Sequence, residues 1–491
     1  MTPSMLHAAG VTLITHGYNS STGGWVTGMA NALSTRLGGN IPIYRINVTS
    51  GGGGLATSIT KISGGNPLAL ASGELIVMLD WGPVSSDSTT TFNVAETVSP
   101  LLAQTNFIAE LAGHALAEFP IHVIGHSRGG SLVCELSQRL GEMGLWVDQV
   151  TTLDAFPLGG DAPVAGYENV LFAESFYQTD YFFDGQVIPG SHWRRQTIAS
   201  GGYGFPYDWH SDVHLWYHGT IDLNTPASNT ETTITSTMRN EWWTAVEHKG
   251  TNAGFISTRR GGGDRLSTLQ PNGANSSPIR DGVNQNFDLG AGIANNRTSI
   301  MFNSGDWPNV IQLAMLTTNP VAHGASADLQ IHFQWAQPAS LMQSVEVFLD
   351  ADQNPLNGNE LLVMSGTASG TTGNQIGAGI ITVPVEAANA PAGMHAVFVR
   401  MSANGRSRVL YAPTTLSVIP SLAPPVLDIA RAEDGVMVGV NGAPGQTVVL
   451  LESDDLNLWQ PMATNVLSSA RWEIPRSADG TNAFYRALLL P

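Results

Sequence analysis

The sequence predicts an α/β fold, a doubly wound and mostly parallel sheet, followed by all-β sandwich-like modules. Two observations favour this class. Over about the first 220 residues, short apolar stretches alternate with segments whose apolar residues recur at helical spacing. After about residue 250, short alternating stretches are separated by Gly, Asn, Pro and Ser, which is typical of all-β structure.

The strands expected in the α/β part share a short apolar centre. They are Val11–Thr15, Ile41–Val48, Glu74–Trp81, Ile121–Ile124 and Trp146–Leu153. Apolar residues at helical spacing predict the intervening helices, over Trp25–Leu37, Val98–Ala117 and Ser131 to about Leu140. Ligands bind at the carboxyl ends of parallel strands, so we expect a site where Tyr18, Ser127 and Asp154 follow such ends.

The chain divides into three predicted domains. Residues 1–250 form the α/β catalytic domain, and residues 251–420 form a β-rich region with an immunoglobulin-like sandwich at about 320–420. Residues 421–491 form a small carboxy-terminal β-module after the proline-marked linker Ile419–Pro425. The sandwich strands are expected over Asp328–Trp335, Ser344–Leu349, Ile380–Val385 and Ala396–Met401.

Composition excludes several classes of function. The net charge of −18 argues against nucleic acid and against an anionic membrane surface as partners. The single cysteine, Cys134, excludes an intrachain disulfide and a zinc site with several cysteines. No apolar run reaches the roughly 18 residues of a transmembrane segment, and no signal peptide is visible. Only 12% of the residues are charged, which favours an exported protein, so we expect it to be secreted or at the cell surface.

The motif Gly125-His126-Ser127-Arg128-Gly129 organises the chain. It follows an apolar run and precedes a helix-compatible segment, which is the pattern of a nucleophile elbow. Residues beside the serine are squeezed between strand and helix, so a side chain at Gly125 or Gly129 would clash. A plain glycine-rich turn is the alternative interpretation.

A serine hydroxyl needs a base to take its proton and a carboxylate to orient that base. In hydrolases with such an elbow the chain order is Ser, then Asp or Glu, then His. Asp154 follows Ser127 directly after a predicted strand, with Asp161 and Asp180 as alternatives. The backbone amides of Arg128 and Tyr18 are the expected donors of an oxyanion hole.

The histidine is not fixed by spacing, because His210, His214 and His218 are each four residues apart. This spacing would also place them on one helical face, where three imidazoles could bind a metal. Several aromatic residues crowd the same segment, and no glutamate stands in the register of a metalloprotease. We therefore expect no metal site and no cofactor, and a metal-dependent hydrolase stays an alternative.

Four stretches, taken in order, resemble the pancreatic-lipase-like branch of the α/β-hydrolases: Thr15–Tyr18, Leu79–Trp81, Val123–Ser127 and Leu153–Asp154. A fifth, from His210 to Tyr217, is similar to that family's histidine segment. The resemblance covers about the first 220 residues. It implies Ser127 as nucleophile, Asp154 as acid, His210 as base, and Tyr18 with Arg128 as oxyanion donors.

The chain departs from this family in several places. It lacks the disulfides, including the one that holds the family's lid, and it shows neither the calcium loop nor the lipid-interaction module. Arg128 stands where the family has a small or apolar residue, and Ala155 stands where it has proline. The β-modules look instead like the accessory immunoglobulin-like domains of exported bacterial enzymes. The run Asp350–Asn354 begins like a calcium loop, but Pro355 replaces the turn glycine, so we interpret it as a polar hairpin loop.

Together these observations predict a serine ester hydrolase, a lipase or carboxylesterase, that works through an acyl-enzyme on a small acyl ester or lipid. The β-modules would contact a polymer, a glycan or a lipid surface, or would space the enzyme. The alternative from another class is a surface-binding or adhesion protein with a degenerate hydrolase domain.

Overall fold

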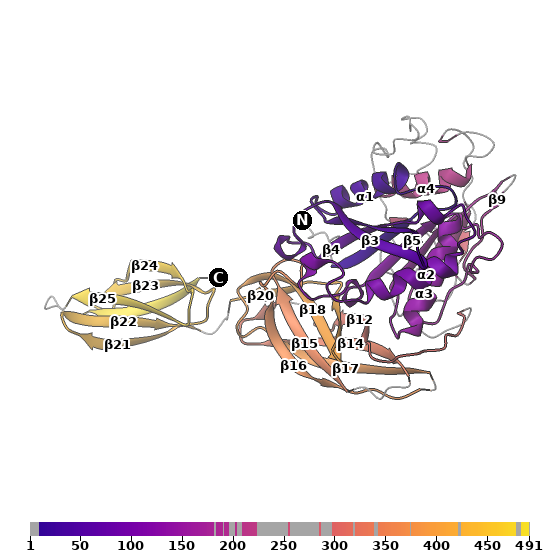
Figure 1. Ribbon diagram of the computed structural model, residues 1–491. Coiled ribbons are helices and arrows are strands. Elements are labelled where there is room, and N and C mark those ends of the chain that lie inside the picture. Colours follow the sequence, from indigo (N-terminus) through magenta and orange to yellow (C-terminus); the bar gives the residue numbers. More distant parts are fainter. Residues whose placement is uncertain are drawn as a thin grey trace.

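A computed structural model of the protein describes residues 9–180, 183–189, 191–195, 202–203, 209–222, 254–255, 284–285, 297–317, 320–337, 342–373, 375–420, 424–477 and 483–490. Within these residues the chain forms several separate sheets and four α-helices (Figure 1). No helix in the described ranges is long and apolar enough to cross a membrane.

The first part of the chain is built on a nine-stranded sheet of order β11-β10-β7-β6-β5-β1-β4-β2-β3. Neighbouring strands from β10 to β2 are parallel, and the edge strands β11 and β3 are antiparallel. The strands are β1 (Gly10–Thr15), β2 (Ile43–Gly51), β3 (Gly54–Ser63), β4 (Glu74–Asp80), β5 (Ile121–His126), β6 (Gln149–Leu153), β7 (Ala173–Tyr177), β10 (His192–Arg195) and β11 (Asn284–Gln285). A separate two-stranded sheet pairs β8 (Thr179–Asp180) with β9 (Phe183–Asp184).

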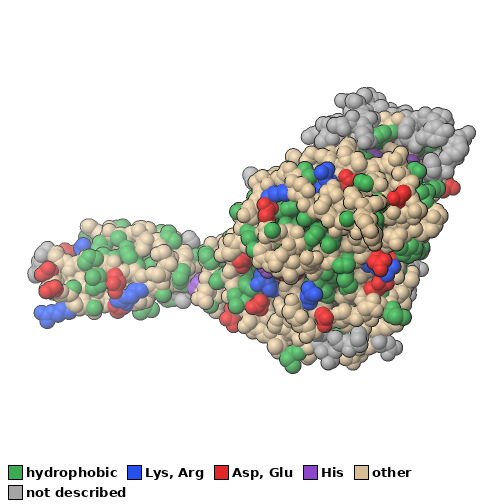
Figure 2. Space-filling model, viewed as in Figure 1, with side chains coloured by type: hydrophobic (Ala, Val, Ile, Leu, Met, Phe, Trp, Pro, Cys, Tyr) green, Lys and Arg blue, Asp and Glu red, His purple; other side chains and the backbone are tan. Residues whose placement is uncertain are grey.

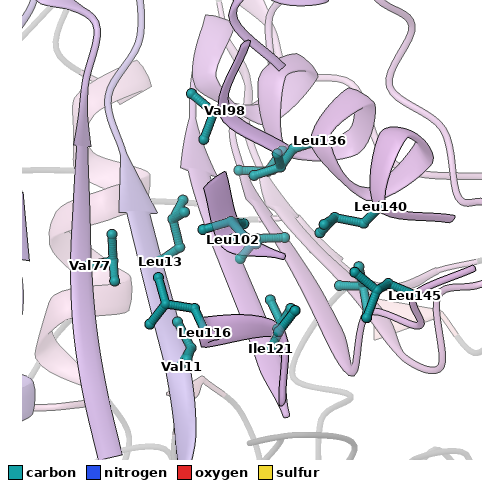
Figure 3. Close-up of a cluster of buried hydrophobic side chains, with 14 of the residues drawn as sticks. Val11, Leu13, Val77, Val98, Leu102, Leu116, Ile121, Leu136, Leu140 and Leu145 are labelled. Carbon is teal, nitrogen blue, oxygen red and sulfur yellow. The ribbon is translucent and has the colours of Figure 1, made fainter. Parts of the chain in front are cut away.

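Helices cover both faces of this sheet. Successive side chains of a strand point to opposite faces of the sheet, so they join two different hydrophobic cores. In β4, Leu75 and Val77 join the core with α2 (Thr91–Leu102) and α3 (Arg128–Glu142), part of which Figure 3 shows. Ile76 and Met78 join the core with α1 (Trp25–Arg36) and α4 (Trp209–Gly219). Single 3-10 turns complete the connections, at Pro67–Ala69, Gly82–Val84, Ala109–Leu111 and Leu116–Glu118.

The helix expected over Val98–Ala117 is wrong. The α-helix begins at Thr91, after a capping box in which Thr90 and Asn93 bond each other's backbone amides, and it ends at Leu102. Ala112 has φ 49° and ends a 3-10 turn, and a second such turn precedes Phe119. The apolar side chains after Leu102 are thus buried in the core although they lie on successive 3-10 turns and not on an α-helix.

A β-sandwich follows. A three-stranded sheet, β12-β14-β17, faces a larger sheet of order β13-β20-β18-β15-β16, in which β19 also pairs with β18. The strands are β12 (Asn309–Met315), β13 (Val321–Ala322), β14 (Ser326–Ala336), β15 (Gln343–Asp350), β16 (Leu361–Ala368), β17 (Ile376–Glu386), β18 (Gly393–Ala403), β19 (Arg406–Tyr411) and β20 (Leu416–Ile419). The four expected sandwich strands fall within β14, β15, β17 and β18.

A second, smaller sandwich ends the chain and stands apart from the rest, as the narrow waist in Figure 2 shows. It pairs sheet β21-β22-β25 with sheet β24-β23-β26 around its own core. The strands are β21 (Val426–Ala432), β22 (Gly435–Asn441), β23 (Thr447–Ser453), β24 (Gln460–Val466), β25 (Arg471–Ser477) and β26 (Phe484–Leu490). The domain boundaries expected after residues 250 and 420 fall beside residues outside the described ranges, so they stay predictions.

The predicted fold class, an α/β doubly wound sheet, is wrong for this protein. The described chain is mostly β, with 45% strand against 17% helix. A doubly wound α/β core would need many more than the four helices observed. The prediction failed because strand–helix alternation was extended over a region where several connections, those from β2 to β3, from β3 to β4 and from β6 to β7, contain no α-helix.

The first sandwich is fused to the nine-stranded sheet by buried polar and aromatic contacts. Arg408 of β19 donates to the Asp148 carboxylate at 3.0 Å and to the Trp146 carbonyl at 3.1 Å. The side chains of Arg408 and Asp148 are 3% and 1% exposed. The stacked rings of Phe348 and Phe398 lie in the same core as α2 and α3. The two parts therefore share one hydrophobic interior.

This buried ion pair generates a stability prediction. Asp148→Asn leaves the Arg408 guanidinium buried without its counter-charge, so we expect the free energy of unfolding to fall by about 3 kcal/mol. Urea denaturation followed by tryptophan fluorescence measures it. Asp428→Asn is the control, since its Arg471 pair is exposed and should contribute far less. Equal effects of the two substitutions would contradict the assignment of the Asp148 pair as a stabilising contact.

A second carboxylate near this junction predicts a pH dependence. Burial raises the pKa of Asp350, which accepts from the Tyr411 hydroxyl, to about 7. Between about pH 4 and 7 the native carboxyl holds a proton that the unfolded chain has lost, so its contribution to stability falls as the pH rises through this window. We expect Asp350→Asn to remove this slope and to raise stability at pH 8 by about 2 kcal/mol.

Urea denaturation at pH 5 and pH 8 measures the slope, with Asp328→Asn, at an exposed position of the same sandwich, as control. A variant that is less stable than wild type at pH 8, with the same pH slope, would show that the carboxyl is ionised in the native protein.

Candidate active site

Ser127 lies in a sharp turn between β5 and α3. Its φ of 57° and ψ of −127° place it in a left-handed conformation that non-glycine residues rarely adopt, and the helix begins with the next residue. A Cβ added at Gly125 would lie 2.1 Å from the Gly129 carbonyl oxygen, and one at Gly129 would lie 2.4 Å from the His16 oxygen. The glycines are required because strand, turn and helix touch at backbone level.

Asp154 follows β6 and is fully buried, also with a positive φ of 47°. Its carboxylate accepts from the Gln178 backbone amide at 2.8 Å, from the Gln178 side chain at 3.2 Å, and from Nδ1 of His210. Burial raises the pKa of the Asp154 carboxyl, and the bonds from His210 and Gln178 oppose that rise. A cation that formed on the His210 ring would therefore face a carboxylate held in a dry site.

His210 is the second residue of α4 and lies beside the Ser127 turn. Nε2 of His126, the residue before Ser127, hydrogen-bonds the His210 carbonyl oxygen at 2.8 Å, and the two ring centroids are 4.5 Å apart. Since the carbonyl can only accept, Nε2 of His126 carries the proton. Burial holds the pKa of His126 well below its usual range, so this ring is neutral.

The other two histidines of α4 occupy different places. His214 is buried and stacks on Trp25 with ring centroids 4.3 Å apart, and burial lowers its pKa well below the usual range. His218 is buried one turn further along the helix. Of the three, His210 is the one hydrogen-bonded to Asp154. In the described ranges, no three His, Cys, Asp or Glu side chains form a group able to hold a metal ion.

The loop after β1 lies against the nucleophile. A Cβ added at Gly17 would be 2.6 Å from the Ser127 Cβ and 2.9 Å from its Oγ. His16, just before, hydrogen-bonds Asp80 at 3.2 Å and stacks on Trp81. Burial alone would raise the pKa of Asp80, but hydrogen bonds from His16, from a threonine and from a backbone amide hold it well below its usual range. Tyr18, the expected oxyanion donor, follows with its side chain 52% exposed.

Arg128, the other expected donor, turns its charged side chain into the protein. The guanidinium makes a bidentate pair with Asp161, at 2.7 and 2.8 Å. Asp161, considered as an alternative acid, is thus bound to Arg128, and the side chain of Asp180 lies outside the described residues. The sequence carried no signal for the Arg128–Asp161 pair or for the Gln178 contacts to Asp154, because these partners lie in loops 33 and 24 residues away, respectively.

Comparisons with known proteins identify no relative. No protein-family model matches the chain, and no curated protein matches it. Among solved structures, a transglutaminase from red sea bream shares 11% identity over 37% of this chain and 26% of its own, with a TM-score of 0.15. An alpha-2-macroglobulin mutant from Salmonella shares 15% identity over 36% of this chain and 14% of its own, with a TM-score of 0.14.

A beta-1,2-glucanase from Parabacteroides distasonis shares 13% identity over 38% of this chain and 35% of its own, with a TM-score of 0.12. This chain thus spans about a third or less of each neighbour, and the likenesses are too low to carry an argument. None indicates a lipase-like family, and the mostly β, multi-sheet architecture does not fit the α/β-hydrolase lipases and esterases. The expected assignment to that fold family is wrong.

The crowded turn at Ser127 predicts a large effect of one methyl group. In Gly125→Ala the new Cβ meets a backbone oxygen at 2.1 Å, which cannot move without shifting α3, so we expect the protein to lose about 3 kcal/mol of stability. Thermal unfolding measures it. Gly52→Ala is the control, since an added Cβ there meets no atom within 4 Å. An unchanged melting temperature in Gly125→Ala would show that strand and helix are further apart than described.

Proposed function

We propose that this protein is a serine hydrolase that cleaves acyl esters through a covalent acyl-enzyme on Ser127. The observation that carries the proposal is the hydrogen bond between the buried Asp154 carboxylate and Nδ1 of His210, beside the strained Ser127 turn. A carboxylate, an imidazole and a strained serine that are remote in sequence have little structural reason to meet in this way.

The geometry supports a defined division of labour. Because Asp154 accepts from Nδ1, the proton on that nitrogen leaves Nε2 of His210 as the basic atom. In the proposed reaction, Nε2 takes the Ser127 proton as Oγ attacks the acyl carbon. The imidazolium that forms is stabilised by Asp154, and it then protonates the departing alkoxide.

Deacylation repeats these steps with water. His210 takes a proton from water, the hydroxide attacks the acyl carbon, and Ser127 Oγ leaves and recovers its proton. No other reactant is needed, and the net reaction converts an ester and water into a carboxylic acid and an alcohol. Esters are the proposed substrate because an alkoxide is a better leaving group than an amide nitrogen.

The negative charge that develops on the acyl oxygen as Ser127 attacks needs hydrogen-bond donors to stabilise it. The backbone amide of Arg128 lies at the positive end of α3, and Gly17, the residue before Tyr18, lies against Ser127. Both are candidates for the oxyanion hole, and both were named from the sequence.

The test is hydrolysis of p-nitrophenyl esters from acetate to palmitate, with an anilide of the same acyl group as a second substrate class. We expect Ser127→Ala and His210→Ala each to lower kcat by about 10,000-fold or more. The double variant should lose little more, because the two residues act as a unit. Ser137→Ala, ten residues along in α3, is the matched control and should keep the wild-type rate.

Four further outcomes bear on the proposal. A fluorophosphonate should label wild type at Ser127 and should fail to label Ser127→Ala. Activity that persists in Ser127→Ala would overturn the nucleophile, and activity lost to EDTA would favour the metal-dependent alternative. A folded wild type that neither hydrolyses any ester nor reacts with the fluorophosphonate would favour a surface-binding protein with a degenerate hydrolase domain.

A further inference from the structure

We propose that Asp161 is a positioning residue which, through the side chain of Arg128, fixes the backbone amide that would bind the oxyanion. The inference rests on the proposed function, and it assigns a role to a buried ion pair that neither the nucleophile, the base nor the acid requires.

The Arg128 side chain is held on every side. Its Nε and Nη2 donate to the two Asp161 oxygens, Nη1 donates to the Ser85 carbonyl at 2.6 Å, and Nη2 also donates to the Thr89 carbonyl. The Arg128 and Asp161 side chains are 4% and 0% exposed. A bidentate pair between a planar fork and a carboxylate fixes direction as well as distance. Four hydrogen bonds therefore orient the first residue of α3, whose amide follows Ser127.

Asp161 is itself anchored to a second helix. Its Oδ1 accepts from the Thr91 amide at 3.0 Å, the first residue of α2, and its Oδ2 accepts from the Leu158 amide at 2.9 Å. The negative charge is favoured there by the positive end of α2. Each oxygen accepts from two donors, so Asp161 is suited to hold a position and has no free lone pair for proton transfer.

Contacts of the Arg128 side chain also extend to the loop that carries the second amide of the proposed oxyanion hole. The Arg128 guanidinium lies over the Trp81 ring, 5.1 Å from its centroid. Trp81 donates its indole N–H to the His16 carbonyl at 3.0 Å, and the two rings are stacked. His16 begins the loop that places Gly17 against Ser127. Arg128 thus contacts the residue that fixes the other side of the oxyanion site.

The choice of a charged pair supports a positioning role over a purely stabilising one. An apolar pair of the same volume stabilises a buried contact as well as or better than an ion pair, but it leaves the direction of α3 less defined. A donor to an oxyanion has to be held within about 0.5 Å of its productive place. The Arg128–Asp161 pair therefore meets a requirement of this turn, because it fixes the direction of the Arg128 amide.

The experiment separates geometry from stability with four variants. Asp161→Asn removes the charge, Arg128→Lys removes the fork, and the double variant Asp161→Leu with Arg128→Met replaces the pair by apolar side chains. Asp148→Asn breaks the other deeply buried arginine pair, remote from the site. For each we would measure kcat, KM, the inhibition constant of an alkyl boronic acid, and the unfolding midpoint. Fluorophosphonate titration counts the folded sites.

Asp161→Asn and Arg128→Lys should lower kcat per titrated site by about 10- to 100-fold, with KM within about twofold. The boronic acid forms a tetrahedral adduct on serine, so its inhibition constant should rise by the same factor as kcat falls. The apolar double variant should regain the unfolding midpoint without regaining kcat. Asp148→Asn should unfold more readily and keep the wild-type kcat per site.

Recovery of both stability and kcat in the apolar double variant would overturn the proposal, since the pair would then serve stability alone. An unchanged kcat and boronic acid affinity in Asp161→Asn would overturn it as well. If Asp161→Asn does not fold, Arg128→Lys and the double variant decide in the same way. Activity that survives Ser127→Ala would instead sink the proposed function, which leaves the two failures distinguishable.

Discussion

The rest of the site depends on the backbone contact between the ends of β1, β5 and β6. Gly129 meets the His16 oxygen, Gly130 meets Ala155, and Gly17 meets Ser127, each at a distance that leaves no room for a Cβ. Hydrogen bonds close the same junction, from the Ser127 amide to the Leu153 oxygen and from the Phe156 amide to the Ser127 oxygen, both at 3.0 Å. The strained serine persists because three strand ends over-determine its position.

Three buried carboxylates lie in or near the part of the chain that carries the site, and their hydrogen-bond partners differ in charge. Asp154 is held by the Gln178 amides and by His210, the contacts that the proposed reaction needs to stabilise a protonated ring. Asp161 is held by the permanently charged Arg128, so it fixes a direction. Asp148, with Arg408, lies at the opposite ends of the strands and joins the sheet to the sandwich. Permanent ion pairs thus serve architecture, while the titratable pair lies beside the strained serine.

The sequence predicted the parts of this structure that are local. The strands at Val11–Thr15 and Ile121–Ile124 were predictable because each is a short apolar run ended by glycine or histidine at the site. The edge strand β3 was missed because small and polar residues separate its three large apolar ones, Leu55, Ile59 and Ile62. The choice among three histidines needed packing: Trp25 stacks on His214, and His210 meets Asp154 across 56 residues. The fold class failed because the balance of helices and turns between strands is a tertiary outcome, as Ala112 and Phe119 show.

The two β-sandwiches differ in whether they share a hydrophobic core with the part of the chain that carries the site. Phe348, Phe398 and Tyr411 of the first sandwich lie in the same core as the helices that flank Ser127. Trp146, at the foot of β6, donates to Gln334 of the first sandwich at 2.9 Å. Removing that sandwich would expose aromatic surface and strand β6, which leads to Asp154, so it acts as part of the scaffold of the site. The carboxy-terminal sandwich closes its own core around Val438, Val448 and Leu450, and it therefore has the anatomy of an independently folding module.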